Sequence, residues 1–278
     1  RHEGVFVVII GLGTAGCNIA SLFKQYGNYK VVLIDEGKGI PKCDTVEECE
    51  EITPNMKRGK LRGVKGDVIF ILCGASKVAS SALRIMEQIK DCNIKVVCVN
   101  PDPFFTPPEY MKRNRVVTCV LQQFARSGLL SEVILFDNKS ITEIVGQGSI
   151  KDFYSKMNGT IASAVHAMNY FDNIKPIFGS RHTPREISRI KTIAIGSVEK
   201  NEEKLYFPLD NVTETCYIYS INEDELETDN DLISRIKQKI SSDEQANIKS
   251  SFCIYSSDDQ QSYYYSIKYT HYIQLEDK

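Results

Sequence analysis

The sequence has no tryptophan, no apolar run long enough to cross a membrane and no strong excess of either charge. A membrane-spanning helix needs about 20 consecutive apolar residues, so we predict that the chain does not cross a membrane. The 36 acidic and 34 basic side chains leave a net charge of −2, which argues against a protein that mainly binds nucleic acid. The 278 residues are enough for one large α/β domain, or for one medium and one small domain.

The nine cysteines show no metal-binding pattern. No two of them form a CxxC motif, and none combines with a histidine at the spacing of a zinc site. Several lie inside apolar segments such as FILCG and VVCVN, where a buried thiol is the ordinary interpretation. The sequence therefore predicts no metal site.

The first half of the chain alternates apolar strands with helices. Unbroken apolar segments such as VFVVII are typical of strands that are buried on both faces of a parallel sheet. Strands are predicted at residues 5–10, 30–36, 63–74, 94–100 and 131–138, and helices at 18–26, 80–90 and 120–130. The proline-rich segment PDPFFTPP is predicted to be a loop. This alternation predicts a Rossmann-type, mostly parallel sheet.

The second half of the chain has a different pattern. Residues 152–174 carry apolar side chains at steps of three and four, which predicts one long helix with a buried stripe. Aromatic-rich strands follow, with one helix at 231–242 and an acidic stretch at 221–231 that we predict to be a solvated loop. The predicted division is a nucleotide-binding-type domain at residues 1–151, a central helix at 152–175 and an α+β domain at 176–278.

A glycine-rich turn, GLGTAG, joins the first strand to the first helix. Gly11, Gly13 and Gly16 allow the backbone to approach a phosphate, and the start of a helix favours an anion. Together with Asp35 at the end of the second strand, the turn fits the dinucleotide fingerprint, in which the acid binds a ribose hydroxyl. An NAD-binding oxidoreductase is therefore one alternative, although no histidine or lysine marks a hydride-transfer partner.

The order of segments resembles the tubulin/FtsZ superfamily over nearly the whole chain. GLGTAGCN is similar to the first phosphate loop of that superfamily, GVGGGGGN, and GDVIFILCGASKVASS resembles the region of its signature GGGTGTG. REISRIKTIAIGS resembles the segment that carries its catalytic acids, and the long helix at 152–174 lies where its central helix lies. The resemblance implies a tubulin/FtsZ-like α/β fold with a smaller α+β C-terminal domain. It also implies GTP or GDP as the cofactor, and self-association or another protein as the partner.

The resemblance assigns residues to the nucleotide site and to catalysis. The residues that it places around the nucleotide are Gly11, Gly13, Gly16, Cys17, Asn18, Gly74, Ser76, Asp137 and Asn158, and Glu186 takes the place of the first catalytic acid. Arg189 stands where the second acid is expected, which changes the local charge.

The GGGTGTG region departs from the superfamily pattern. Only Gly74 remains clearly, and the Cβ atoms of Val78 and Ala79 would crowd a loop that wraps around phosphates. One interpretation is a modified phosphate loop with charge from Lys77. The alternative is an ordinary strand-to-helix turn in which Ser76 caps the helix.

The expected function is that of a divergent tubulin-like protein with degraded GTPase loops. It would act in the cytoplasm, or in the host cytoplasm if the source is viral, mainly through protein–protein contacts as a structural or regulatory subunit. A filament-forming GTPase of the phage or plasmid type, with Glu186 as its catalytic acid, is the second alternative. The oxidoreductase is the third.

Overall fold

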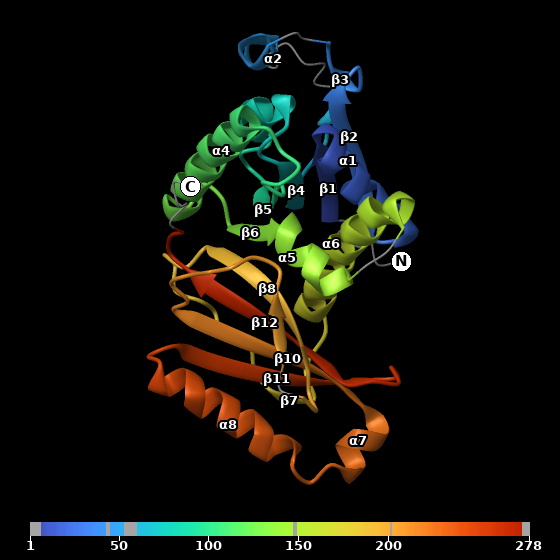
Figure 1. Ribbon diagram of the computed structural model, residues 1–278, viewed down its shortest axis with the longest axis vertical. Coiled ribbons are helices and arrows are strands. Elements are labelled where there is room, and N and C mark those ends of the chain that lie inside the picture. The colour runs from blue at the N-terminus through green and yellow to red at the C-terminus, as the bar shows by residue number, and fades with distance from the viewer. Residues whose placement is uncertain (1–6, 43–44, 53–59, 147–148, 201, 274–278) are drawn as a thin grey trace. The chain divides into compact units, whose positions relative to one another are not determined.

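The computed structural model describes residues 7–42, 45–52, 60–146, 149–200 and 202–273 (Figure 1). The chain forms two compact units, Arg1–His166 and Ala167–Lys278, which divide within one long helix, α6 (Ile150–Asn173). The three-part division predicted from the sequence treats this helix as a segment of its own and stays a prediction. The long helix itself is confirmed. In its predicted stripe Phe153 is half-buried, and the other residues are buried: Met157, Ile161, Val165, Met168 and Phe171.

The first unit is built on a parallel sheet. Its strands are β1 (Val7–Leu12), β2 (Tyr29–Glu36), β3 (Gly39–Ile40), β4 (Asp67–Cys73), β5 (Asn93–Asn100) and β6 (Glu132–Asp137). They lie in the order β3-β2-β1-β4-β5-β6, and each neighbouring pair is parallel. This is the doubly wound order, in which the direction of winding reverses between β1 and β4. The Rossmann-type sheet predicted from the sequence is confirmed.

The helices of the first unit differ in extent from those predicted. They are α1 (Gly13–Leu22), α2 (Val46–Ile52), α3 (Ala82–Glu87), α4 (Pro108–Arg126), α5 (Asn138–Val145) and the first part of α6, with the short 3-10 segments η1 (Phe23–Gln25) and η4 (Lys77–Ser81). α1 begins directly after β1, five residues before the predicted start. α4 begins at Pro108 instead of residue 120, because proline fits the first turn of a helix, where its missing N–H would have no partner.

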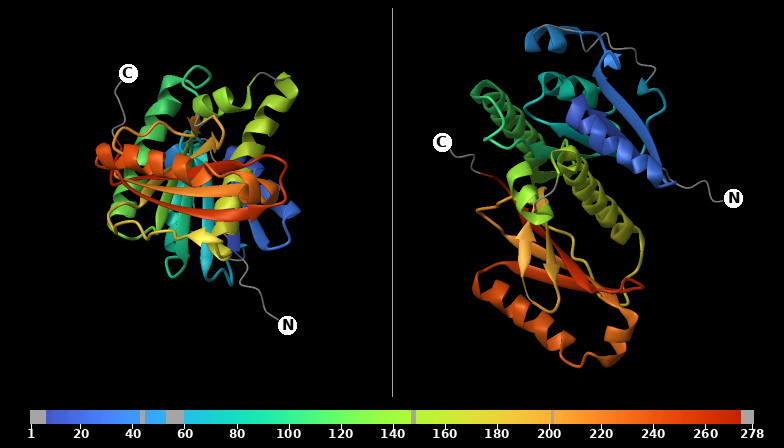
Figure 2. Two further views of the ribbon diagram at one scale, coloured as in Figure 1. Left: turned by 90° about the horizontal axis from the view of Figure 1, so that it is seen from below. Right: turned by 45° about the vertical axis from the view of Figure 1, so that its right-hand side comes forward.

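The second unit is an α+β module, as predicted. Its strands are β7 (Phe178–Gly179), β8 (Ile190–Ser197), β9 (Glu203–Leu205), β10 (Glu214–Asn222), β11 (Lys249–Ser257) and β12 (Tyr263–Thr270). They lie in the order β8-β12-β10-β11-β7, with β9 paired to β8, and only the β10–β11 pair among these described strands is parallel. α8 (Leu232–Gln245) lies along one face of the strands (Figures 1 and 2), where Leu232 and Ile236 pack against Tyr217, Tyr219 and Tyr264.

The acidic stretch predicted as a loop contains a helix, α7 (Glu223–Thr228). The side chain of Asn222 accepts a hydrogen bond from the Asp224 N–H and caps this helix. Three acidic residues in the first turn lie next to the positive end of the helix dipole, where their negative charge stabilises the helix. The acidic residues therefore stabilise the start of a helix, and the prediction of a loop over the whole stretch was wrong.

No described helix combines the length and the apolar character that crossing a membrane requires. Within the same residues, no group of histidine, cysteine, aspartate and glutamate side chains is arranged to hold a metal ion.

Candidate functional site

The turn after β1 meets the turn after β4 at the carboxyl edge of the first sheet. We call residues 11–16 the Gly13 turn and residues 74–81 the Ser76 turn. A Cβ atom added to Gly13 would lie 2.6 Å from the Ser76 Oγ and 3.0 Å from the Val78 Cγ2. Gly13 also has a φ of +72°, which side chains disfavour. In doubly wound sheets, ligands bind where the winding reverses, and both turns lie there.

The other two glycines of the Gly13 turn are required for packing. A Cβ atom on Gly16 would lie less than 3.0 Å from the Ile71 carbonyl oxygen of β4. A Cβ atom on Gly11 would lie 2.5 Å from the Gly16 carbonyl oxygen. These two positions allow α1 to pack closely on β1 and β4, which sets the place of the helix N-terminus.

The N-terminus of α1 is open. Leu12 occupies the N-cap position and supplies no side-chain cap, and the first turn of the helix carries no acidic residue. The first N–H groups of a helix have no partner within it and attract anions. The start of α1 therefore has the chemistry of a phosphate-binding site.

Cys17 and Asn18 are neighbours on α1, but one side chain is buried and the other is exposed. The Cys17 thiol is buried and lies 3.4 Å from the Gly11 carbonyl oxygen and 3.5 Å from that of Ile34, to which it donates. Burial raises the pKa of this thiol, with a further contribution from nearby Asp35. Asn18 is exposed. Cys17 thus belongs to the packing beneath the turn, whereas Asn18 is accessible to a ligand.

The Ser76 turn uses its own backbone groups. The Ser76 N–H donates to the Cys73 carbonyl at 3.1 Å, and the Ala79 N–H donates to the Ser76 carbonyl at 3.1 Å. The Lys77 ammonium forms an ion pair with Glu36 at 2.7 Å. Ser76 occupies the N-cap position of η4, but its side chain makes no capping hydrogen bond there. The predicted helix cap by Ser76 is therefore wrong, because its hydroxyl faces Gly13 instead.

Both oxygens of the Asp35 carboxylate accept hydrogen bonds. Thr14 Oγ1 donates to Asp35 Oδ2 at 3.2 Å, and the Glu36 N–H donates to Asp35 Oδ1 at 2.9 Å. A dinucleotide-binding protein would use this carboxylate for a ribose hydroxyl. Each carboxylate oxygen can accept a further hydrogen bond, so this role of Asp35 stays a prediction.

Asp137 is engaged as the cap of α5. Its Oδ2 accepts hydrogen bonds from the N–H and the hydroxyl of Ser140, both at 2.9 Å. Burial raises the pKa of Asp137 and Asp102 adds to the effect, while the bonds from Ser140 oppose it. Asn158 lies half-buried on α6, next to Met157 in the core.

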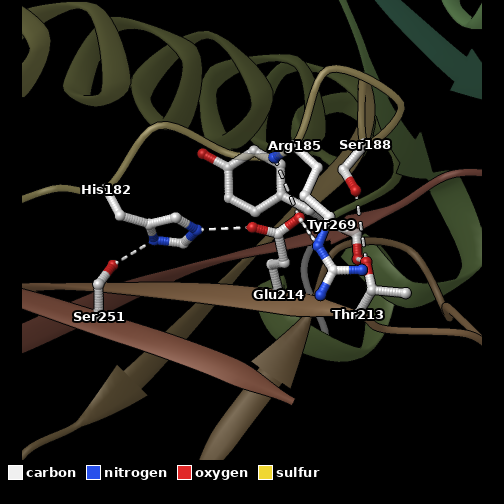
Figure 3. Close-up of polar contacts among 7 residues, drawn as sticks. All are labelled: His182, Arg185, Ser188, Thr213, Glu214, Ser251 and Tyr269. Atoms are coloured by element: carbon white, nitrogen blue, oxygen red, sulfur yellow. Dashed lines mark hydrogen bonds and ion pairs between the residues drawn. The ribbon is translucent and has the colours of Figure 1, made fainter. Parts of the chain in front are cut away.

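A network of polar side chains holds residues 180–189 of the second unit, which we call the Glu186 loop (Figure 3). His182 lies between two strands: its Nδ1 is 2.7 Å from the Ser251 Oγ of β11, and its Nε2 is 2.7 Å from the Glu214 Oε2 of β10. The Glu214 side chain is completely buried. One carboxylate at the start of β10 therefore anchors the beginning of the loop.

The same carboxylate anchors the tip of the Glu186 loop. The Arg185 N–H donates to Glu214 Oε1 at 3.1 Å, and the Arg185 Nε lies 3.7 Å from this oxygen. The Ser188 N–H closes a turn onto the Arg185 carbonyl at 2.8 Å, and Glu186 is exposed within that turn. Burial alone would raise the pKa of Glu214, but hydrogen bonds from His182 and the Arg185 N–H outweigh it and hold the pKa below its usual value.

Comparison with known proteins finds no matching family profile and no matching curated protein. Solved structures do match. A TubZ protofilament in the GTPyS form, from Bacillus thuringiensis serovar israelensis, aligns with a TM-score of 0.71 at 15% identity, over 96% of this chain and 86% of that chain. An FtsZ dimer from M. jannaschii aligns with a TM-score of 0.67 at 13% identity, over 95% of this chain and 88% of that chain. CetZ from Methanosaeta thermophila aligns with a TM-score of 0.68 at 12% identity, over 96% and 86%.

The chain has the tubulin/FtsZ fold. The resemblance seen in the sequence is confirmed at the level of the fold, with identities low enough to make the chain divergent from these structures.

In this tubulin/FtsZ fold, the predicted site residues fall into separate groups. Gly13 and Ser76 come together, Gly11, Gly16 and Cys17 pack beneath them, and Asn18 is exposed on α1. Asp137 caps α5, Asn158 lies on α6, and Glu186 belongs to the second unit. The nucleotide-binding and catalytic roles assigned to them stay predictions.

Two residues of α4, which no motif in the sequence indicated, support the Ser76 turn. Arg113 Nη1 donates to the Ala75 carbonyl at 3.0 Å. Asn114 is 2% exposed, and its Oδ1 lies 2.5 Å from the position of a Cβ atom on Gly74. Recognising Pro108 as the start of α4 would have placed both residues on a helix, but only the tertiary contacts identify their role.

Proposed function

We propose that this protein binds a guanine nucleotide with its phosphates at the start of α1, and that it acts by self-association with slow or absent hydrolysis. The observation that carries the proposal is the contrast between two adjacent turns. The Gly13 turn leads into an uncapped helix, whereas the Ser76 turn is closed by its own hydrogen bonds.

The Gly13 turn suits a phosphate. The absence of a Cβ at Gly13 lets the Ser76 turn lie against the start of α1, and the uncapped N–H groups that follow Gly13 attract an anion. The exposed side chains of Thr14 and Asn18 lie on the same helix. Gly13 and Thr14 would hold the phosphates, and Asn18 would be available to the rest of the nucleotide.

The Ser76 turn supports slow hydrolysis. The N–H groups of Ser76 and Ala79 already have carbonyl partners, so they are not free to stabilise charge that develops on a phosphate. The ion pair with Glu36 also offsets the charge of Lys77. On the Glu186 loop, the second expected acid is an arginine.

Self-association is supported by the fold and by exposed apolar side chains. TubZ is described as forming protofilaments and two-stranded filaments. In this chain, Phe104 and Phe105 follow β5 at the carboxyl edge of the sheet and are 86% and 65% exposed. Exposed aromatic side chains of this size favour a protein contact.

Nucleotide content and assembly can be measured on the same preparation. We expect heat-denatured protein to release GTP or GDP, and light scattering to rise when GTP is added while phosphate release stays slow. Gly13→Ala should abolish both binding and scattering, whereas Gly27→Ala should not, because no atom of the described residues lies within 4 Å of a Cβ there. Fast phosphate release that increases with protein concentration would contradict the proposal.

A filament-forming GTPase is the second candidate, favoured by the position of Glu186. The residue is exposed in a turn that the buried Glu214 anchors, which suits a carboxylate presented to a second copy. Glu186→Gln should then abolish phosphate release without preventing assembly. Glu199→Gln, at another exposed glutamate in a turn of the second unit, is the matched control.

A further inference from the structure

An apolar cavity of about 530 Å³ lies between α3 and the C-terminal end of α4. Its apolar lining consists of Leu83, Met86, Ile94, Phe124, Leu129 and Leu130. Protein cavities of about 300 to 1,000 Å³ with this character commonly hold one small molecule. The cavity is separate from the proposed nucleotide site, because Ile94 lies at the amino end of β5 and the Gly13 turn lies at the carboxyl end of the parallel strands.

The end of α4 shapes one wall of this cavity. Gly128 has a φ of +82°, which ends the helix, and the N–H groups of Leu129 and Leu130 both donate to the Phe124 carbonyl, at 3.1 and 3.3 Å. Leu130 is buried as a result, while Leu129 is 65% exposed at the cavity. A large apolar side chain exposed beside an apolar hollow indicates a surface that a ligand would cover.

The charges at the cavity favour an anion. Three charged side chains line it, and two of them, Arg84 and Glu87, pair with each other at 3.9 Å. The third is Lys90, which is exposed and has no carboxylate within ion-pair distance among the described residues. An apolar hollow with one uncompensated ammonium group matches a molecule with an apolar body and one negative charge.

We propose that this cavity binds a small amphiphilic carboxylate, with its alkyl or aryl body against Met86, Phe124 and Leu129 and its carboxylate near Lys90. The inference does not depend on nucleotide binding, since none of these residues belongs to the Gly13 turn or the Ser76 turn.

The test compares two probes that share an alkyl chain and differ in charge. Decanoate and decylammonium are titrated into the full chain by isothermal calorimetry, below the concentrations at which they form micelles. We expect decanoate to bind saturably with one molecule per chain, and decylammonium to bind about tenfold more weakly or less.

Two pairs of variants locate the site. Lys90→Glu should weaken decanoate binding by about tenfold or more, and Lys112→Glu, at an exposed lysine of α4 outside the cavity, should leave it unchanged. Leu129→Gln should weaken it by about tenfold, and Val116→Gln, at a position 63% exposed outside the cavity, should not. All four positions are exposed, so the variants are expected to fold, which circular dichroism would verify.

Three results would overturn the proposal: no saturable decanoate binding, equal binding of the two probes, or equal effects of the cavity variants and their matched controls. Failure of nucleotide binding would leave it untouched, since the calorimetry needs no nucleotide.

Discussion

The Gly13 turn and the Glu186 loop are held in place in opposite ways. In the Gly13 turn, side chains are absent where the backbone of α1 packs against β1 and β4. In the Glu186 loop, side chains supply the structure, since one buried carboxylate binds His182 and the Arg185 N–H. Added side-chain volume should therefore destabilise the Gly13 turn, where backbone packs against backbone. Loss of a hydrogen-bond partner or a fall in pH should destabilise the Glu186 loop.

The largest effect should come from removing the anchor of the Glu186 loop. Glu214→Ala leaves His182 and the Arg185 N–H without their acceptor, and we expect it to lower the free energy of unfolding by about 3 to 5 kcal/mol. Urea unfolding followed by circular dichroism measures this. Glu199→Ala, at an exposed position, should change stability by about 0.5 kcal/mol at most. A similar small effect for Glu214→Ala would mean that the network does not support the fold.

Added volume should have the next largest effect, in the Gly13 turn. Gly16→Ala places a Cβ against the Ile71 carbonyl, and we expect it to lower the free energy of unfolding by about 3 kcal/mol. Gly27→Ala introduces no such contact with the described residues and should cost much less. The same urea experiment compares them, and equal effects would break the distinction between the two segments.

The pH dependence should separate the two segments further. The pKa of Glu214 is lowered in the folded chain, so its stabilising contribution is present above the unfolded pKa of about 4.3 and is lost as the pH falls through the folded pKa. Glu214→Gln should therefore flatten the loss of stability in acid, and Gly16→Ala should keep the wild-type slope. Urea midpoints measured from pH 7 down to pH 3 test this, and parallel curves for wild type and Glu214→Gln would contradict it.

A smaller effect is expected at the α5 cap, which is a hydrogen-bonded element within the first unit. Asp137→Ala removes the acceptor for both Ser140 groups and should cost about 1 kcal/mol. Asp137→Asn keeps a capping oxygen and removes a charge that burial disfavours, so it should be close to neutral. Thermal unfolding of the two variants distinguishes these outcomes, and an equal loss in both would assign the effect to the charge.

The smallest effect, with the opposite sign, is expected at a glycine without close contacts. Gly159 lies inside α6, and no atom of the described residues lies within 4 Å of a Cβ added there. Gly159→Ala should raise the free energy of unfolding by about 0.5 to 1 kcal/mol, because glycine is the poorer helix former. A loss of stability in thermal unfolding would show that close contact alone does not decide which glycines are required.

Local patterns predicted most of the strands and the long helix. Apolar runs specify buried strands wherever both faces of a sheet are covered, and a stripe at steps of three and four specifies a helix. Helix starts were harder to predict. Gly13 begins α1 despite the low helix propensity of glycine, because packing leaves no room for a side chain there. Pro108 begins α4 because the N–H that proline lacks would have no partner in the first turn of a helix. The prediction of a loop in the acidic stretch was wrong for a similar reason, because the side chain of Asn222 caps the start of α7.

The candidate site was predictable only in part. Gly13 and Ser76 follow parallel strands, so the sequence placed both at one edge of the sheet. It did not place Asn114 behind Gly74, because their contact depends on how α4 packs. Nor did it predict that Glu214 would bind His182, since the two are 32 residues apart and meet only through the pairing of β10 with its neighbours.

The sequence by itself determined the alternation of strands and helices along the first half of the chain, the long helix and the glycine-rich turn. It also determined the resemblance to the tubulin/FtsZ superfamily, which the solved structures confirm at the level of the fold. Only the tertiary structure decided that the start of α1 is open while the Ser76 turn is closed, that Asp137 serves as a cap, and that Glu214 holds the Glu186 loop. The physical reason is range: periodicity and glycine act between near neighbours, whereas a hydrogen-bond partner, a close contact or a cavity wall comes from wherever the packed chain brings it.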